Sequence, residues 1–391
     1  MIRLAVIFES SPFDRKGLFN AVHNRVKHLA ALDRCEIDVF CIHSRDNAFT
    51  RYVRHTPQTP DVESVEIEGI SYRMLWYEFS MTDHMMLEIL HVRPLYFRSF
   101  IRRCLGQLEG YDIVSAHSFT GSLLAYKAHQ MYGIPYFVTW HGSDVHTHPW
   151  RIPVILEDTA RIMENAVCNF FVSRSLLETS DRITVRASKE VLYNGVSEDF
   201  FRYDAEKVDR LRKVFGLEEG TKVVAFVGNM SRIKNVHMLP SIFSEVRSRY
   251  GNRLMFWIVG DGKERGRVED DIRRSGFSAD DVRFWGNQPA GLMPDIMNCI
   301  DVLVLPSRNE GLPLVCAEAL SCGANVVGAH VGGIPEIIGE DNCIPHGETF
   351  VGRMADRIVT MLETEVAQTV PADMDWSVSA GQEWKLMDSF E

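Results

Sequence analysis

Hydrophobic and polar positions alternate along this chain in two patterns that together predict a parallel α/β structure. Short runs that are apolar at every position predict strands buried on both faces, as in parallel sheets. The polar stretches between them carry apolar positions at helical spacing, as at Val22, Val26 and Leu29, and predict amphipathic helices. In the first half of the chain the predicted strands are Ile2–Phe8, Ile37–Cys41, Ile113–Ala116, Tyr136–Thr139 and Phe170–Val172.

The same alternation begins again in the middle of the chain and predicts a second unit. Between the two series lies the turn-rich segment Val191–Tyr203. We therefore expect two doubly wound, Rossmann-like α/β units, one covering residues 1–196 and the other residues 197–370. The predicted strands of the second unit are Val223–Val227, Met255–Val259, Val282–Trp285, Asp301–Leu305 and Asn325–Gly328.

A small hairpin is predicted as an insertion into the first unit. Val65–Ile67 and Tyr72–Leu75 have strand composition and flank Glu68 and Gly69, which are turn formers.

Composition narrows the class of protein. The formal net charge of −11 argues against a nucleic-acid-binding protein, which normally presents a broad basic face. No apolar run is long enough to cross a bilayer, and the first residues lack the basic region of a signal peptide. The eight cysteines form no C-x-x-C pair and are expected to be reduced thiols. We therefore expect a cytoplasmic protein.

The segment after the predicted strand Asp301–Leu305 has the composition of an anion-binding helix start. Gly311 permits a turn, and Pro313 suits the first position of a helix that would end near Gly323. The backbone amides of Leu314 and Val315 would then be free at the helix N-terminus. Amides and helix dipole both favour a phosphate at the carboxyl edge of a parallel sheet.

Two carboxylates flank this predicted phosphate site. Glu310 lies in the loop before the helix, and Glu318 lies about one turn inside it. A carboxylate is repelled by phosphate but accepts strong hydrogen bonds from sugar hydroxyls. The pair therefore favours a nucleotide-sugar ligand, whereas either residue alone would be interpreted as a surface acid.

Basic residues follow the first strand of the second unit. Arg232 and Lys234 lie in the loop after Gly228, where cations would stabilise the charge that develops on a leaving diphosphate. The alternative is that they are ordinary exposed residues on the first turn of a helix, although basic residues are unfavourable there.

The paired glutamates resemble a motif of the family 4 retaining glycosyltransferases, which have the GT-B fold. Glu310 and Glu318 bracket Gly311-Leu312-Pro313, and Val331–Ile338 is similar to the segment that closes the site in that family. The resemblance implies two Rossmann-like domains facing a central cleft. The first would bind the acceptor and the second the donor, and residues 371–391 would cross back to the first.

The implied activity is retaining transfer of a sugar from a nucleoside diphosphate sugar to an acceptor hydroxyl. UDP is favoured over GDP as the nucleotide, and no metal or other cofactor is implied. The only D-x-D sequence, Asp373–Asp375, lies in the tail and follows no predicted strand.

The resemblance also assigns roles in the donor site. Glu318 matches the glutamate that holds the ribose hydroxyls, Glu310 the one near the transferred sugar, and Lys234 the family's lysine. Asn229 stands where the family usually has an arginine, and Arg232 is a candidate substitute. The remaining donor-site candidates, from glycine loops, the base-binding segment and the helix start, are Gly17, Gly260, Arg283, Phe284, Gly311, Leu312, Pro313, Leu314 and Val315.

Two histidines follow predicted strands of the first unit. His117 follows Ile113–Ala116, and His141 follows Tyr136–Trp140 with Asp144 close behind. Both strand ends should face the ligand edge of the sheet. By resemblance, His141 would contact the sugar or phosphate, Asp144 would order the acceptor, and His117 is a weaker match and a donor-site candidate. The expected catalytic residues are His141, Asp144, Glu310 and Lys234.

Residues 91–108 combine arginines with aromatic residues at helical spacing. Arg98, Arg102 and Arg103 alternate with Phe97 and Phe100, a pattern compatible with peripheral contact to an anionic membrane and a lipid-linked acceptor. An ordinary surface helix explains the same periodicity.

The sequence leaves the sugar and the acceptor open. Synthesis of a polysaccharide or glycolipid such as capsule, O-antigen or exopolysaccharide is one expectation. A phosphorylase, an epimerase or a non-catalytic nucleotide-sugar-binding subunit remain alternatives.

Overall fold

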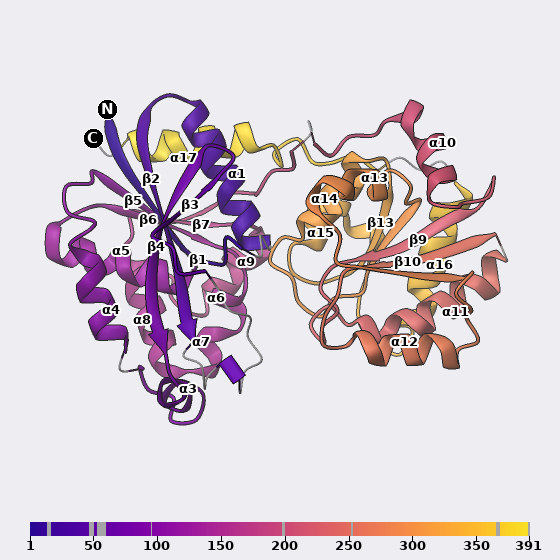
Figure 1. Ribbon diagram of the computed structural model, residues 1–391, viewed down its shortest axis with the longest axis horizontal. Coiled ribbons are helices and arrows are strands. Elements are labelled where there is room, and N and C mark those ends of the chain that lie inside the picture. Colours follow the sequence, from indigo (N-terminus) through magenta and orange to yellow (C-terminus); the bar gives the residue numbers. More distant parts are fainter. Residues whose placement is uncertain are drawn as a thin grey trace. The chain divides into compact units, whose positions relative to one another are not determined.

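The computed structural model describes residues 1–13, 17–46, 51–52, 60–94, 96–197, 200–251, 253–364 and 368–389. The chain forms two compact units (Figure 1). The N-terminal unit consists of Met1–Asn194 and Trp376–Glu391, and the C-terminal unit of Gly195–Asp375.

The N-terminal unit is built on a sheet with, among the described residues, eight strands in the order β3-β4-β2-β1-β5-β6-β7-β8. Every pair is parallel except β3 with β4. Burial explains the apolar runs in the sequence, since β5 and β6 are buried at every position. The strands are β1 Ile2–Glu9, β2 Cys35–Asp46, β3 Ser64–Ile67, β4 Ile70–Phe79, β5 Ile113–His117, β6 Tyr136–Trp140, β7 Cys168–Phe171 and β8 Lys189–Val191.

The expected hairpin is present, but it belongs to the main sheet and is not an insertion. β4 belongs to the main sheet and pairs in parallel with β2, from Val39 opposite Tyr72 to Asp46 opposite Phe79. Its hairpin partner is β3, which pairs antiparallel with the first residues of β4 from Ser64 opposite Arg73 to Ile67 opposite Ile70, across the turn at Glu68 and Gly69.

Helices cover the faces of this sheet. They are α1 Gly17–Ala31, α3 Met81–Glu88, α4 Tyr96–Leu105, α5 Ser118–Tyr132, α6 Ser143–His146, α7 His148–Arg151, α8 Pro153–Asn165, α9 Arg174–Ser180 and α17 Trp376–Asp388. None of the helices within the described ranges is both long and apolar enough to cross a bilayer.

The C-terminal helix α17 packs against α1 through a buried ion pair. Arg25 Nη1 donates to Glu383 Oε2 at 2.8 Å, and both side chains are almost fully buried. Arg25 Nη2 also donates to Asn194 Oδ1, and Ser115 Oγ donates to Glu383 Oε1. A buried carboxylate is stable only with such partners, so this network holds the last helix to the N-terminal unit.

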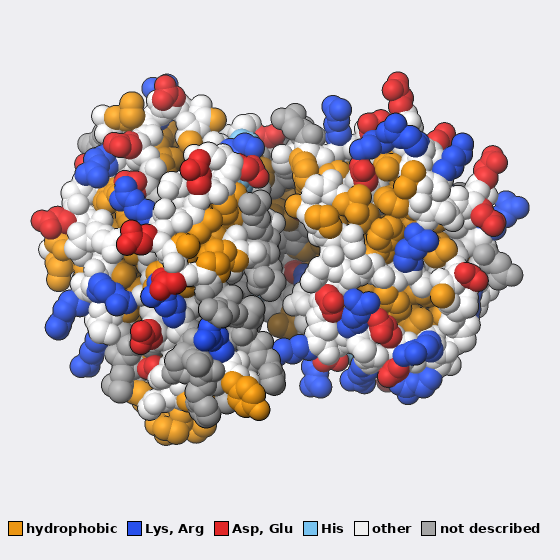
Figure 2. All heavy atoms as spheres, viewed as in Figure 1, with side chains coloured by type: hydrophobic (Ala, Val, Ile, Leu, Met, Phe, Trp, Pro, Cys, Tyr) orange, Lys and Arg blue, Asp and Glu red, His pale blue; other side chains and the backbone are white. Residues whose placement is uncertain are grey.

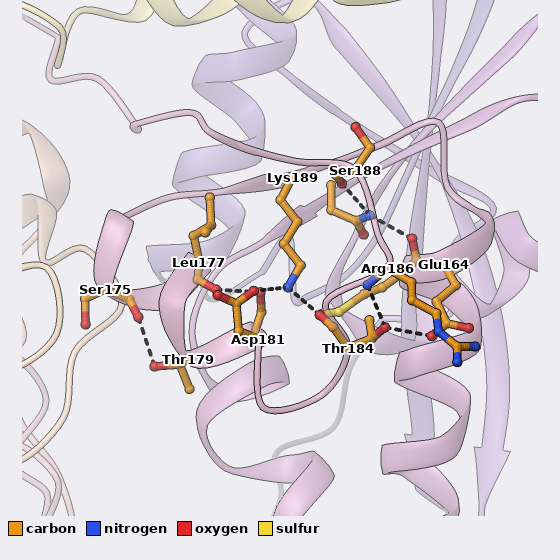
Figure 3. A network of polar contacts seen from close by, with 12 residues as sticks. Glu164, Ser175, Leu177, Thr179, Asp181, Thr184, Arg186, Ser188 and Lys189 are labelled. Carbon is orange, nitrogen blue, oxygen red and sulfur yellow. Dashed lines mark hydrogen bonds and ion pairs between the residues drawn. The ribbon is translucent and has the colours of Figure 1, made fainter.

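The loop between α9 and β8 is fixed by polar contacts (Figure 3). Lys189 Nζ donates to Asp181 Oδ1 and to the carbonyl of Thr184, while Thr184 Oγ1 donates to Glu164 on α8. These contacts fix the start of β8, the edge strand of the sheet.

The C-terminal unit has a parallel sheet with, in the described part of the chain, six strands in the order β11-β10-β9-β12-β13-β14. The strands are β9 Lys222–Val227, β10 Leu254–Val259, β11 Val282–Gly286, β12 Val302–Leu305, β13 Asn325–Ala329 and β14 Cys343–Ile344. The helices are α10 Ala205–Val214, α11 Leu239–Tyr250, α12 Arg265–Arg274, α13 Met293–Met297, α14 Leu314–Ser321, α15 Ile334–Ile338 and α16 Phe350–Glu363. The chain enters and leaves this unit side by side, because Val196 pairs in parallel with Asp375.

Candidate functional site

The loops after β9 and β10 pack backbone against backbone at the carboxyl edge of the C-terminal sheet. A Cβ on Gly260 would lie 2.1 Å from the carbonyl oxygen of Gly228, so only glycine fits there. The amide of Gly228 donates to Val259, and that of Met230 donates to Asp261. This contact fixes the start of the segment that carries the predicted phosphate-binding lysine.

Lys234 reaches Glu310 from a turn that precedes the next helices. Its Nζ lies 2.7 Å from Glu310 Oε1. The neighbouring Asn235 is buried, adopts a positive φ of 57° and accepts a hydrogen bond from Arg308 Nε at 3.0 Å. Lys234 and Arg232 therefore lie in a turn and not on the first turn of a helix, as one interpretation of the sequence had it.

Glu310 is held by partners on several segments. Ser307 Oγ donates to Glu310 Oε1 at 2.6 Å, and His346 Nε2 hydrogen bonds to the carbonyl of Ser307 at 2.9 Å. The Glu310 side chain is only 9% exposed. Neither Ser307 nor His346 was selected from the sequence, since Ser307, three residues before Glu310, is a common residue at a strand end and His346 is a single residue far from the motif.

The segment after β13 closes over the Glu310 loop. A Cβ on Gly332 would lie 1.9 Å from the carbonyl oxygen of Glu310, and the amide of Gly333 donates to the carbonyl of Gly311 at 3.0 Å. Gly332 also has a positive φ of 54°. The backbone on either side of Glu310 is therefore fixed by direct contact.

Helix α14 begins at this loop without a side-chain cap. Pro313 is the N-cap with extended backbone, so Leu314 and not Pro313 is the first helical residue. The amides of Leu314 and Val315 lie in the first turn, where no intrahelical acceptor exists. Burial and the nearby Glu310 carboxylate raise the pKa of the Cys316 thiol, and the Lys234 ammonium lowers it. Leu312 is buried at the end of the loop.

Glu318 lies one turn into α14 and is half-buried. Burial raises the pKa of its carboxyl to about 7. Within the described residues it has no hydrogen-bond or ion-pair partner, in contrast to Glu310. The carboxylate is thus able to accept hydrogen bonds from a ligand.

Among the described residues, the other donor-site candidates do not contact Lys234 or Glu310 through side-chain hydrogen bonds or ion pairs. The Arg232 side chain is 80% exposed and lies 3.2 Å from Glu264, and Asn229 is exposed. Arg283 donates to the carbonyl of Phe215 at 2.7 Å, while Phe284 is half-buried in β11. The structure therefore joins Lys234 to Glu310 but gives Arg232 a different partner.

In the N-terminal unit, His117 and His141 form a hydrogen-bonded pair. His117 Nδ1 and His141 Nε2 are 3.0 Å apart at the ends of β5 and β6. Burial lowers the pKa of His117 well below its usual value, and burial together with Arg25 lowers the pKa of His141 to about 3. Both rings are neutral at physiological pH, so one donates and the other accepts.

The backbone beside His117 is strained. Ser118, the first residue of α5, has a φ of 65°, and its Oγ accepts a hydrogen bond from the amide of Glu9 at 3.0 Å. Strain of this kind is common at functional sites. Gly17, by contrast, is exposed, and a Cβ there would meet nothing within 4 Å. Among the described residues, Gly17 therefore has no close contact that would require a glycine.

Asp144 lines a cavity of about 530 Å³ within the N-terminal unit. The side chain is 7% exposed, its Oδ2 has no hydrogen-bond partner among the described residues, and burial raises its pKa. The same cavity is lined by Glu9, Tyr77, Arg93 and Asp158.

These four cavity residues were not selected from the sequence. Tyr77 donates to Glu9 Oε1 at 2.7 Å, and Arg93 pairs with Asp158. They come from four separate elements or loops, so no local spacing signals them. Throughout the described ranges there is also no cluster of three or more His, Cys, Asp or Glu suited to a metal ion.

Comparison with known proteins gives the same picture for both units. The family described as glycosyl transferases group 1 matches residues 221–364, and the glycosyl transferase 4-like domain matches residues 17–195. N-acetyl-alpha-D-glucosaminyl L-malate synthase of Bacillus anthracis is 28% identical over 67% of this chain and 68% of the relative. The 2-deoxystreptamine glucosyltransferase of Streptomyces kanamyceticus is 29% identical over 71% of this chain and 73% of the relative.

Solved structures share the architecture over the whole chain. Anabaena HepE in complex with UDP is similar with a TM-score of 0.75, at 17% identity, over 99% of this chain and 100% of that one. This likeness shows the fold, which is GT-B with two parallel-sheet α/β domains. Since the two family matches together span most of both units, the chain belongs to the family 4 glycosyltransferases.

Proposed function

We propose that this glycosyltransferase moves a sugar with retention of configuration from a nucleoside diphosphate sugar, with UDP favoured as the nucleotide. The observation that carries the proposal is the contact of Lys234 with Glu310 beside the uncapped start of α14. A cation and free amides favour a diphosphate, and a fixed carboxylate favours sugar hydroxyls. The UDP complex of HepE supports the choice of nucleotide for a protein of this fold.

In this proposal the C-terminal unit binds the donor. The diphosphate accepts hydrogen bonds from the amides of Leu314 and Val315 and a charge-assisted bond from Lys234. Glu318 accepts hydrogen bonds from the ribose, and Glu310 from the transferred sugar. Lys234 and the helix dipole supply the positive charge that the leaving group needs, so the reaction requires no divalent ion.

The proposed chemistry is attack of the acceptor oxygen on the face from which the leaving group departs. The bond between the anomeric carbon and the phosphate oxygen breaks, and the bond to the acceptor oxygen forms on the same face. The acceptor proton passes to the departing phosphate oxygen. Retention follows without a covalent enzyme intermediate.

The N-terminal unit would bind the acceptor in the cavity that Asp144 lines. The unpartnered Asp144 Oδ2 would accept a hydrogen bond from an acceptor hydroxyl. The neutral His141 would donate to the donor sugar or phosphate, since its pKa of about 3 leaves it uncharged. Polysaccharide or glycolipid synthesis in the cytoplasm, with peripheral membrane contact through residues 91–108, fits this arrangement.

A screen of UDP-sugars and GDP-sugars tests the proposal. One nucleotide sugar should raise the thermal unfolding midpoint of the wild-type protein. When an acceptor saccharide is added, the nucleoside diphosphate of that donor should be released as a product. Lys234→Ala and Glu310→Gln should each reduce turnover by roughly a hundredfold, the usual effect of removing one transition-state contact. Lys213→Ala, on exposed α10, is the control and should leave turnover unchanged. Donor binding without turnover on any acceptor would contradict catalysis and indicate a binding subunit.

A further inference from the structure

An apolar groove runs between α4 and α5 on the N-terminal unit. Its volume is about 750 Å³, and its floor includes Leu105 and Leu123, which are 6% and 5% exposed. Phe97 and Ile101, one helical turn apart on α4, are half-buried in its wall. Met131 on α5 is 61% exposed. Hydrophobic side chains on a helix usually pack against the core. Those that line this groove are partly open to solvent, so they are available to a ligand.

The groove has a positively charged rim. Arg98, Arg102 and Lys127 line it, and both arginines are exposed. Within the described residues neither Arg98 nor Arg102 has an ion-pair partner. Two unpaired guanidinium groups beside an apolar floor match an amphiphile with an anionic group.

The groove is continuous with the cavity that Asp144 lines. Arg93, Pro94 and Phe97 belong to both. The cavity itself carries three acids, Glu9, Asp144 and Asp158, against the single guanidinium of Arg93, and it is also lined by His84 and His148. A phosphate would be repelled from this acidic cavity and attracted to the basic rim of the groove. The cavity therefore suits the hydroxylated part of a ligand, and the groove suits its anionic part.

Exposed hydrophobic side chains extend beyond the groove on the same unit. Met86 of α3 lines the groove, and the neighbouring Met85, Ile89, Leu90 and Val92 are 43% or more exposed. Figure 2 shows hydrophobic side chains gathered at the lower end of this unit, where Figure 1 labels α3.

We propose that the groove between α4 and α5 binds the hydrocarbon chain of a lipid phosphate that carries the acceptor saccharide. The saccharide lies in the cavity, the phosphate lies near Arg98 and Arg102, and the chain lies along Phe97, Ile101 and Leu123. The proposal rests on the proposed function for the identity of the head group, and it names the acceptor as a lipid-linked saccharide. This proposal differs from one in which helix α4 lies on a membrane surface, because here the groove binds one hydrocarbon chain of a single lipid molecule.

The test uses monomeric dodecyl phosphate, below its micelle concentration, as the probe in calorimetric titrations. Each methylene added between octyl and dodecyl phosphate should raise affinity about fourfold. Gly106 lines the groove, and a Cβ there would meet nothing within 4 Å, so Gly106→Trp is designed to place an indole ring in the groove. This variant should bind dodecyl phosphate at least tenfold more weakly.

Gly381→Trp is the matched control, because Gly381 is equally unhindered and lies on α17 outside the groove. It should bind the probe as the wild type does. The double variant Arg98→Gln and Arg102→Gln should weaken dodecyl phosphate and leave the neutral dodecyl maltoside unaffected. This variant keeps the test decisive should the tryptophan disturb folding.

Several results would overturn the groove proposal. They are the absence of binding, an affinity independent of chain length, unchanged affinity in Gly106→Trp, or binding to phosphatidylglycerol vesicles without binding to the monomer. UDP titrations of the same proteins are interpreted separately. Failure of the wild type to bind UDP contradicts the proposed transfer, whereas failure to bind dodecyl phosphate contradicts the groove alone.

Discussion

At the scale of single residues, the two glutamates of the donor site differ in their surroundings. Glu310 is paired with Lys234 and Ser307, whereas Glu318 is half-buried without a partner among the described residues. An unpaired carboxylate is sensitive to pH, and ligand binding should therefore be coupled to its protonation.

Donor binding should strengthen as pH rises through about 7. Burial raises the Glu318 pKa to about 7, so most of this carboxyl is protonated at pH 6 and ionised at pH 8. Ribose hydroxyls donate to the ionised form, so the ligand must displace a proton at low pH. Affinity for UDP-glucose should be about tenfold higher at pH 8 than at pH 6. A UDP-sugar suits this calorimetric measurement because its diphosphate does not titrate in this range.

Glu318→Gln is the control for that pH profile. It should bind UDP-glucose with nearly constant affinity between pH 6 and 8, because glutamine does not titrate. A flat profile in the wild type would show that Glu318 does not contact the ligand.

Sequence reasoning proposed the candidate donor-site residues that belong to one local motif. Glu310, Gly311 and Glu318 share a loop and a helix, so their spacing is visible along the chain. His346 was missed because its contact with the carbonyl of Ser307 joins segments 39 residues apart, whereas Ser307 lies only three residues before Glu310 and was overlooked as a strand-ending serine. Arg232 was paired with the phosphate by sequence proximity, but its side chain points to Glu264.

At the scale of elements, the loop before α14 depends on the segment after β13. Gly332→Ala places a methyl carbon 1.9 Å from the carbonyl oxygen of Glu310. Residue 332 also has a positive φ, a backbone conformation that favours glycine. We expect this variant to lose at least tenfold in UDP affinity, because Glu310 and the start of α14 must move. Gly347→Ala, where a Cβ meets nothing within 4 Å, should bind UDP normally. Equal affinities of the two variants in calorimetry would argue against a fixed Glu310 loop.

Helix α17 depends on the buried pair of Arg25 and Glu383. Glu383→Gln leaves the Arg25 guanidinium buried without its counter-charge, at a cost of about 3–5 kcal/mol. The midpoint of thermal unfolding should fall by roughly ten degrees. Glu245→Gln removes one partner of the more exposed pair with Arg249 and should shift the midpoint by less than about two degrees. Unchanged melting of Glu383→Gln would show that α17 is held by apolar packing alone.

Elements with strong patterns were predictable, and those defined by long-range pairing were not. The apolar runs of β9, β10, β12 and β13 signal buried strands without further information. β14 is two residues long and has no pattern of its own. β4 was correctly predicted as a hairpin arm, but its parallel pairing with β2 was missed because the sequence does not show that the two strands lie side by side.

At the scale of the whole molecule, two units of the same class divide the proposed work. The C-terminal unit contains the lysine, the two glutamates and the uncapped helix, so the proposed donor binding depends on that unit. The N-terminal unit contains the neutral histidine pair, the Asp144 cavity and the groove beside α4. Each unit can therefore be probed by its own ligand in the intact protein, with UDP for one and a lipid phosphate for the other.

Calorimetric titration of the intact protein with UDP tests the central claim most directly. The account predicts that UDP binds the wild type and that Lys234→Ala weakens binding by at least tenfold, because a charge-assisted contact to the diphosphate is lost. Lys213→Ala should retain the wild-type affinity. Absence of UDP binding, or equal affinity in wild type and Lys234→Ala, would contradict the claim that this lysine and the start of α14 hold a diphosphate.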